Sequence, residues 1–209
     1  MKGLILKDLY NLSSSLKIYV LFYLFYGFMA VSQGQTALLY SLIYITGVML
    51  PLSAISYNER SNWDRLVNTM PVTRKQVVYS IYILAAILLT GSSLISGGTL
   101  LLQKNIDRKE ILAGLTAIII LSLFYQSVII PVVLVLGGEK GRLVVMTATL
   151  LPVVIFGIIA ESGIASSAAI ESFAADKGIL ITAVIAAVLA VCYRLSVFFS
   201  VRYYSKKDL

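Results

Sequence analysis

Long apolar segments separated by short polar ones make up almost the whole chain. Residues 18–58, 76–103, 111–138 and 143–160 contain no Asp, Glu, Lys or Arg, and residues 178–201 contain only Arg194. A helix that crosses a bilayer needs about 20 mostly apolar residues. Segment 18–58 is about twice that length and has a polar break at 32–35, so it predicts two spans. The pattern therefore predicts an all-α integral membrane protein with six transmembrane helices.

The predicted domain is a single six-span transmembrane unit, residues 18–209, with its spans at 18–32, 36–57, 76–102, 111–136, 143–160 and 178–201. Before it, residues 1–17 mix apolar side chains with Lys2, Lys7 and Lys17, which predicts an amphipathic helix lying in the membrane interface. A frayed tail is the alternative. Between the last two spans, residues 161–177 are small and weakly apolar, and predict either a disordered loop or short helices in the outer leaflet.

Composition agrees with a membrane protein, and the charge pattern orients it. The chain is 59% hydrophobic and 13% charged, which excludes an ordinary soluble domain. Twelve Lys and Arg residues fall in the segments on the side of the termini, four fall on the other side, and Arg194 lies within the last span. Because cytoplasmic loops carry the excess of Lys and Arg, both termini are predicted to be cytoplasmic in a multi-pass protein of the cell membrane. The net charge of +7 therefore reflects topology and does not indicate nucleic acid binding.

The longest polar segment between spans covers residues 58–76. Its apolar residues recur at helical spacing (Trp63, Leu66, Val67 and Met70), and most of its charged residues lie off that stripe (Glu59, Arg60, Asp64 and Arg65). This pattern predicts a short amphipathic helix that ends before Pro71. Thr73 and Gln76 form a capping-box pattern, which predicts the start of the next span. A helix that merely lies on the membrane surface is the alternative for this segment.

Tyrosines follow the first two spans at helical spacing: Tyr19, Tyr23 and Tyr26 in the first, Tyr40 and Tyr44 in the second. Such a stripe is typical of packing between helices. The alternative is a wall, apolar with hydroxyl groups, along which an amphipathic substrate passes.

The chain lacks several residue types that catalysis or ion coupling needs. There is no histidine, and no predicted span carries an Asp, Glu or Lys near its middle. The glycine-rich turn 137–142 lacks the order of a phosphate-binding loop. We therefore expect no catalytic residue, metal site or cofactor in this chain, and energy for any uphill transport has to come from a partner.

The sequence between the second and third spans, NERSNWDRLVNTMPVTRKQVVYS, resembles the membrane subunit of ATP-binding-cassette exporters of the type-two permease family. Members often carry an acidic residue here, then a short amphipathic helix, then a P-V-[ST]-R-x-x-[IV]-V run. In this chain Glu59, residues 62–70 and residues 71–78 match these three features. The resemblance extends to the topology of most of the chain.

The resemblance implies a mechanism. The helix in 58–76 would be a cytoplasmic coupling helix seated in a cleft of a separate ATPase subunit, with Trp63, Leu66, Val67 and Met70 as apolar anchors and Glu59, Arg60, Asp64 and Arg65 as polar contacts. Two copies of the chain would pair as a homodimer with two ATPase subunits, which would hold ATP and Mg. Short outer-leaflet helices at 161–177 would close the exit. Small bacterial permeases that export peptides are the nearest likeness.

Two other classes of function compete with this interpretation. A self-sufficient channel, holin-like pore or scaffold would use the polar turn and the tyrosines without any ATPase. An intramembrane enzyme acting on lipid is disfavoured because histidine and an acidic cluster are missing. An amphipathic wall suits peptides, lipids and drugs alike, so the sequence leaves the substrate open.

Overall fold

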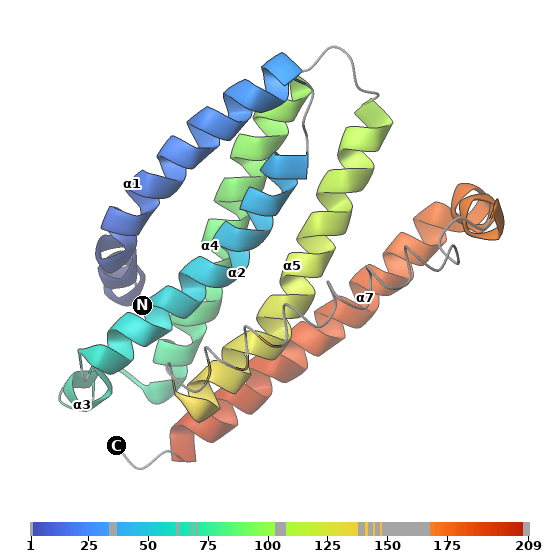
Figure 1. The fold of residues 1–209 in the computed structure, drawn as a ribbon. Coiled ribbons are helices and arrows are strands. Elements are labelled where there is room, and N and C mark those ends of the chain that lie inside the picture. Colours follow the sequence, from blue (N-terminus) through green and yellow to red (C-terminus); the bar gives the residue numbers. More distant parts are fainter. Residues whose placement is uncertain are drawn as a thin grey trace.

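Helices form every regular element in the part of the chain that the structure describes, as the apolar pattern predicted. The computed structural model describes residues 2–33, 37–61, 63–67, 69, 71–102, 108–137, 141, 144, 147 and 168–206. The helices, drawn in Figure 1, are α1 (Lys2–Gln33), α2 (Ala37–Arg60), α3 (Trp63–Val67), α4 (Arg74–Leu101), α5 (Arg108–Leu136) and α7 (Ala168–Lys206).

Five of these helices are long and apolar enough to cross a membrane: α1, α2, α4, α5 and α7. They contain the first, second, third, fourth and sixth predicted spans. The predicted fifth span, 143–160, lies outside the described residues except for Val144 and Thr147. A helical membrane protein is therefore confirmed, while the fifth span, and with it the total of six, stays a prediction.

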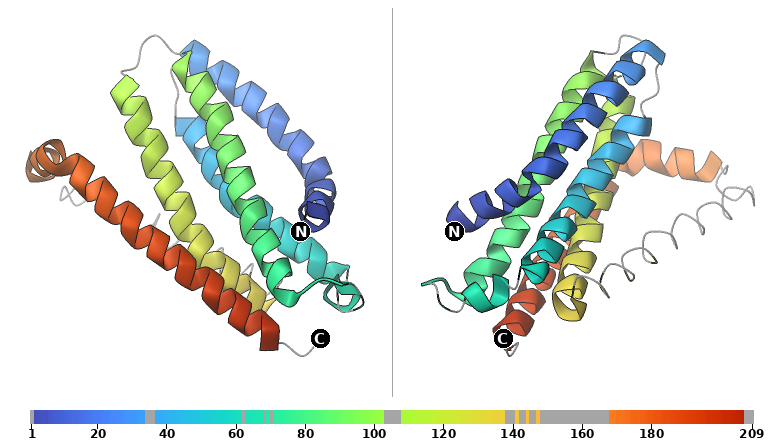
Figure 2. Two further views of the ribbon diagram at one scale, coloured as in Figure 1. Left: turned by 180° about the vertical axis from the view of Figure 1, so that it is seen from behind. Right: turned by 60° about the vertical axis from the view of Figure 1, so that its left-hand side comes forward.

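The first helix differs from the predicted division into an interfacial helix and a span. Residues 2–33 form one continuous helix, because neither proline nor an internal glycine interrupts the chain around residue 17. Figures 1 and 2 show that the first turns of α1 run in a different direction from the rest of the helix. The amino-terminal segment is thus the bent first part of α1, and its place in the membrane interface stays a prediction.

The last helix begins ten residues earlier than the predicted span, at Ala168 instead of Gly178. Residues 168–177 contain several alanines and no proline or glycine, so helix propensity extends α7 toward the amino terminus. In Figure 1 the first turns of α7 are seen end-on while the rest runs across the view, so the helix bends. The remainder of the predicted outer segment, 161–167, lies outside the described residues.

The centre of the bundle is made by α2, α4 and α5, with α1 on one flank and α7 on the other (Figures 1 and 2). Val78, Ile81 and Ile130 belong to the main apolar core between these helices. The flanking helices expose large apolar side chains, among them Phe28 on α1 and Phe199 on α7. Because lipid tails are as apolar as these side chains, close packing and interhelical hydrogen bonds hold such a bundle together.

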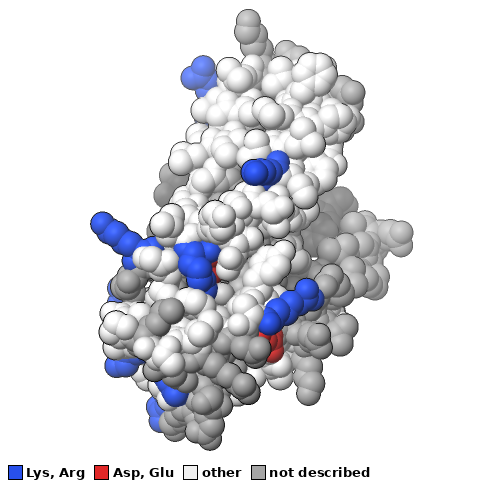
Figure 3. Space-filling view, turned by 90° about the vertical axis from the view of Figure 1, so that its left-hand side faces the viewer, with Lys and Arg blue, Asp and Glu red and all other residues white. Residues whose placement is uncertain are grey.

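The short helix α3, the first turns of α1 and the carboxyl-terminal end of α7 lie toward the same end of the bundle, which we call the α3 end (Figure 1). On the face drawn in Figure 3, Lys and Arg side chains gather mainly in the lower half, toward this end. The two termini therefore lie toward one end, as the predicted topology requires.

Candidate functional site

The α3 end is built from two helix ends and the short helix between them. The last turn of α2 includes Glu59 and Arg60, and Ser61 then closes a turn in which its amide donates to the Tyr57 carbonyl at 3.1 Å. Helix α3 follows within the predicted 62–70 segment but is shorter, at Trp63–Val67. Asn62, Asn68 and Met70 lie outside the described residues.

The capping box predicted at the start of the next span is confirmed. The Gln76 amide donates to the Thr73 hydroxyl at 3.4 Å, and the Thr73 amide donates to the Gln76 side-chain oxygen at 3.1 Å. These bonds satisfy two backbone donors that a helix start otherwise leaves free. Helix α4 therefore begins sharply at Arg74, directly after the turn that leaves α3.

Some of the described side chains of α3 pack against the core of the bundle, and others face outward. Val67 is 1% exposed and belongs to the main core, and Trp63 packs against the same core. Leu66 is 50% exposed. The side chains of Asp64 and Arg65 are not described. Of the predicted apolar anchors, then, Val67 and Trp63 hold α3 against its own bundle, and Leu66 faces outward; their role toward a partner stays a prediction.

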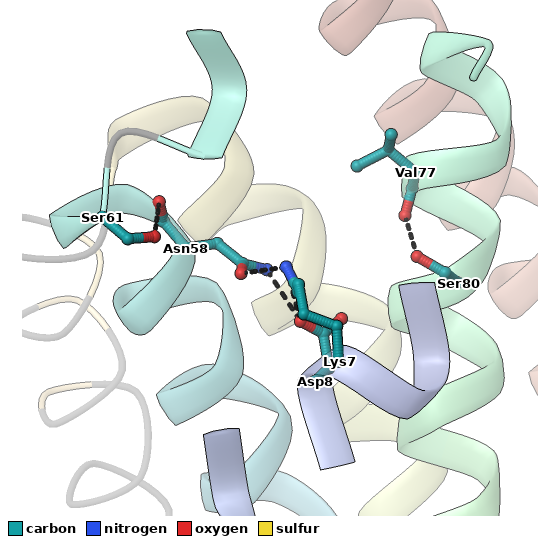
Figure 4. Close-up of polar contacts among 6 residues, drawn as sticks. All are labelled: Lys7, Asp8, Asn58, Ser61, Val77 and Ser80. Atoms are coloured by element: carbon teal, nitrogen blue, oxygen red, sulfur yellow. Dashed lines mark hydrogen bonds and ion pairs between the residues drawn. The ribbon is translucent and has the colours of Figure 1, made fainter. Parts of the chain in front are cut away.

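A buried polar network joins the start of α1 to the end of α2 (Figure 4). Lys7 Nζ lies 2.9 Å from Asp8 Oδ1 and donates to Asn58 Oδ1 at 2.5 Å, and Asn58 Nδ2 donates to Asp8 Oδ1 at 3.3 Å. Lys7 Nζ also lies 3.7 Å from the centroid of the Trp63 ring, within cation–π range. The amino-terminal helix is thereby tied to both α2 and α3.

Sequence reasoning missed this network, although one signal was present. Asp8 stands four residues after Leu4 and four before Leu12, so it shares their helix face, and all three are buried. A carboxylate on a buried stripe needs a charged or hydrogen-bonding partner, because burying it alone costs several kcal/mol. The pattern indicated that Asp8 has a partner, but not which helix supplies it.

Glu59 brings the end of α2 against the end of α5. A Cβ atom added at Gly137 would lie 2.6 Å from Glu59 Oε1. Gly137 also has a φ of +83°, and its amide closes the last turn of α5 by donating to the Val133 carbonyl at 2.9 Å. Both the backbone conformation and the close approach of Glu59 therefore favour glycine here, and the start of the glycine-rich turn is a helix cap.

A small cavity of about 30 Å³ lies at the α3 end. Its lining includes Asn58, Glu59, Trp63, Gly137 and Tyr204, so side chains from α2, α3 and α7 meet there beside the end of α5. Binding sites for small molecules usually measure about 300–1,000 Å³. The cavity therefore marks the place where these helices meet, and it is too small for a transported peptide or lipid.

The tyrosines of the first two spans lie mainly between helices. Tyr23 is buried and its hydroxyl is 2.9 Å from Thr46 Oγ1, while the Tyr44 ring packs edge-on against Tyr125. Tyr40 donates to the Ile111 carbonyl at 3.5 Å. Tyr19 and Tyr26 are partly buried against apolar clusters. The five side chains thus pack within one chain, and a pathway role stays a prediction.

Comparison with known proteins agrees with the architecture. The family model described as ABC-2 family transporter protein matches residues 3–205, which include nearly all of the chain from the start of α1 to the end of α7. No curated protein and no solved structure gives a significant match to the sequence. Together with the five membrane-length helices, the family match shows that this chain is a multi-pass membrane permease belonging to the ABC-2 transporter family.

Proposed function

We propose that the chain is the permease subunit of an exporter whose energy comes from ATP hydrolysed by a separate ATP-binding-cassette subunit. The observation that carries this proposal is the position of α3, a short helix at the junction of α2 and α4 with one side seated in the core and Leu66 exposed. In this proposal the partner docks on Leu66 together with the exposed Glu59 and Arg60. Asp64, Arg65 and Met70 complete the docking surface.

The packing of α3 supports a mechanical role. Val67 contributes to the core that also contains Val78 of α4 and Ile130 of α5, while Trp63 is in contact with Lys7 of α1. Because close-packed cores move as units and do not deform continuously, displacement of α3 carries α2 and α4 with it. When the ATPase subunits close on ATP and Mg, they would displace α3 and in this way tilt the helix bundle.

The assembly we propose contains two copies of this chain and two ATPase subunits in the plasma membrane, with the α3 end and both termini in the cytoplasm. Basic side chains toward that end support this orientation. The apolar outer faces of α1 and α7 support a pair surrounded by lipid. The substrate class is amphipathic or hydrophobic, such as a peptide, a lipid or a drug.

Gentle purification from the native membrane tests the proposal. We expect an ATP-binding subunit in equal amount to the permease, and we expect Glu59→Ala and Trp63→Ala to reach the membrane folded but to lose substrate-stimulated ATP hydrolysis. Leu102→Ala, at an exposed position at the far end of α4, is the matched control and keeps it. A chain that purifies alone and conducts ions or solutes in liposomes would instead establish a self-sufficient channel.

A further inference from the structure

Helix α2 contains a proline that leaves one backbone carbonyl without its helical partner. Pro51 lies inside α2 and has no amide hydrogen, so the carbonyl four residues earlier, that of Gly47, cannot make the usual bond. In the apolar interior of a membrane protein, an unpaired carbonyl is costly. A donor from elsewhere is therefore needed at this point of α2.

Gln126 of α5 supplies that donor. Its side-chain nitrogen lies 2.7 Å from the Gly47 carbonyl oxygen and 3.4 Å from the Ala85 carbonyl oxygen of α4. The side chain is 1% exposed. Because both neighbours are carbonyl oxygens, only the amide nitrogen can face them, which settles the orientation of the amide group. One side chain of α5 thus bonds to both of the other central helices, α2 and α4.

The three helices are closely packed at this level. A Cβ atom added at Gly47 would lie 2.8 Å from Leu89 Cδ1, so α2 and α4 approach closely where the backbone hydrogen bonding of α2 is interrupted. The oxygen of Gln126, on the other side of the amide, is buried and has no hydrogen-bond partner among the described residues. Leaving this oxygen unpaired costs free energy that an apolar side chain at position 126 would avoid. The amide is therefore explained by the hydrogen bonds that its nitrogen donates.

We propose that Gln126 is a positioning residue that holds α2 at one angle at Pro51, where the backbone hydrogen-bond ladder of the helix is broken. Residues 52–60 follow the break and carry Asn58 and Glu59 directly into α3. The Gln126–Gly47 bond thereby sets where α3 stands relative to α4 and α5. This proposal rests on the proposed function, because the consequence of a fixed angle is efficient transfer of motion from the ATPase to the bundle.

A double-mutant cycle in detergent tests the bond itself. Gln126→Met removes the donor and lowers Tm by at least about 2 °C, because the Gly47 carbonyl is left buried and unpaired. Pro51→Ala restores a backbone donor to that carbonyl, so Gln126→Met costs much less in the double variant. As a control, Thr46→Val removes a buried hydroxyl that bonds to the Leu42 and Ile43 carbonyls and to the Tyr23 hydroxyl, none of which involves Pro51, so its effect adds to that of Pro51→Ala. An additive Gln126/Pro51 cycle overturns the proposal.

The positioning role needs a readout other than stability. With Cys192→Ser as background, spin labels at the exposed Tyr57 and Leu102 report how residues 52–60 move relative to α4 in the permease–ATPase complex. In the complex that carries only these changes, we expect ATP and Mg to shift this distance. We expect Gln126→Met to lose this change in distance while the ATPase stays bound. The double variant Gln126→Met with Pro51→Ala should regain stability but not the change in distance.

The outcomes separate the two proposals. A normal shift in Gln126→Met, or a shift that returns together with stability in the double variant, means that Gln126 is merely structural and overturns the positioning role. An unsubstituted chain that binds no ATPase overturns the proposed function, and with it the positioning role, whatever the stability cycle shows.

Discussion

The Lys7 ammonium nitrogen lies 3.7 Å from the centroid of the Trp63 ring, so the first helix of the chain contacts the short helix at the junction of α2 and α4. The same nitrogen pairs with Asp8, which is 2% exposed, and with Asn58 at the end of α2. The Lys7 ammonium group therefore compensates the buried Asp8 carboxylate and also makes a cation–π contact with the Trp63 ring. Displacement of α3 together with the end of α2 therefore acts on the first turns of α1 as well.

Lys7→Met is expected to lower the unfolding free energy in detergent by about 2–3 kcal/mol, because it leaves the Asp8 carboxylate buried with only the Asn58 amide. Adding Asp8→Asn recovers most of the loss, since the uncompensated charge is then gone. Lys2→Met, at an exposed position on the same helix, is the control and stays within about 0.5 kcal/mol. Denaturant titration checks all three variants. Equal effects of Lys7→Met and Lys2→Met would show that the network contributes nothing.

Tyr82→Phe is expected to loosen α7 from α4. The Tyr82 hydroxyl lies 2.6 Å from Ser196 Oγ and 2.8 Å from Ser200 Oγ, and all three groups are buried. Hydrogen bonds between membrane helices contribute on average about 0.6 kcal/mol, so losing both costs about 1 kcal/mol. Tyr79→Phe, exposed on the same helix, is the matched control. Hydrogen exchange of the α7 amides measures the loosening, and identical exchange in both variants would refute the contact.

Thr73→Ala is expected to destabilise the start of α4 by about 1 kcal/mol, whereas Thr73→Ser retains the capping oxygen and is close to neutral. The reason is the reciprocal pair of bonds between Thr73 and Gln76. Unfolding free energies of the two variants give the comparison. If the serine variant is as unstable as the alanine variant, the hydroxyl does not cap the helix.

Gly114→Ala is expected to cost about 1–3 kcal/mol, because a Cβ atom there would lie 2.6 Å from the Tyr40 ring and hydroxyl. Gly91→Ala is the matched change, since nothing lies within 4 Å of a Cβ atom at that position. It removes the entropic cost of glycine in a helix and is expected to stabilise by about 0.5–1 kcal/mol. Melting temperatures in detergent should therefore move in opposite directions. Two shifts of the same sign would mean that α2 and α5 are not packed through Tyr40.

Apolar length and capping chemistry made the spans predictable. Segments 76–102 and 111–136 were expected to be spans, and α4 and α5 cover Arg74–Leu101 and Arg108–Leu136. Their limits follow from local rules: the thickness of a bilayer, a capping box and the cost of charged residues in lipid. The same rules do not tell where a helix without proline stops, which is why α1 and α7 proved longer than expected.

Contacts between helices were not predictable in the same way. The sequence places Asp8 on the buried stripe of Leu4 and Leu12 and puts Gln126 inside a span, so both needed partners. Those partners, Asn58 and the Gly47 carbonyl, lie 50 and 79 residues away along the chain. Helical periodicity determines which face of a helix is buried but not which other helix covers it. For the same reason the tyrosine stripe was open to two interpretations.

Photocrosslinking from position 66 in the native membrane tests most directly whether α3 binds an ATPase subunit. A benzophenone amino acid replaces Leu66, which is exposed on α3, and in a matched sample it replaces Leu102, which is exposed at the far end of α4. We expect a crosslink from position 66 to an ATP-binding subunit and none from position 102. Crosslinks from position 66 only to lipid or to a second copy of the chain, with an ATPase absent from both samples, would contradict this expectation.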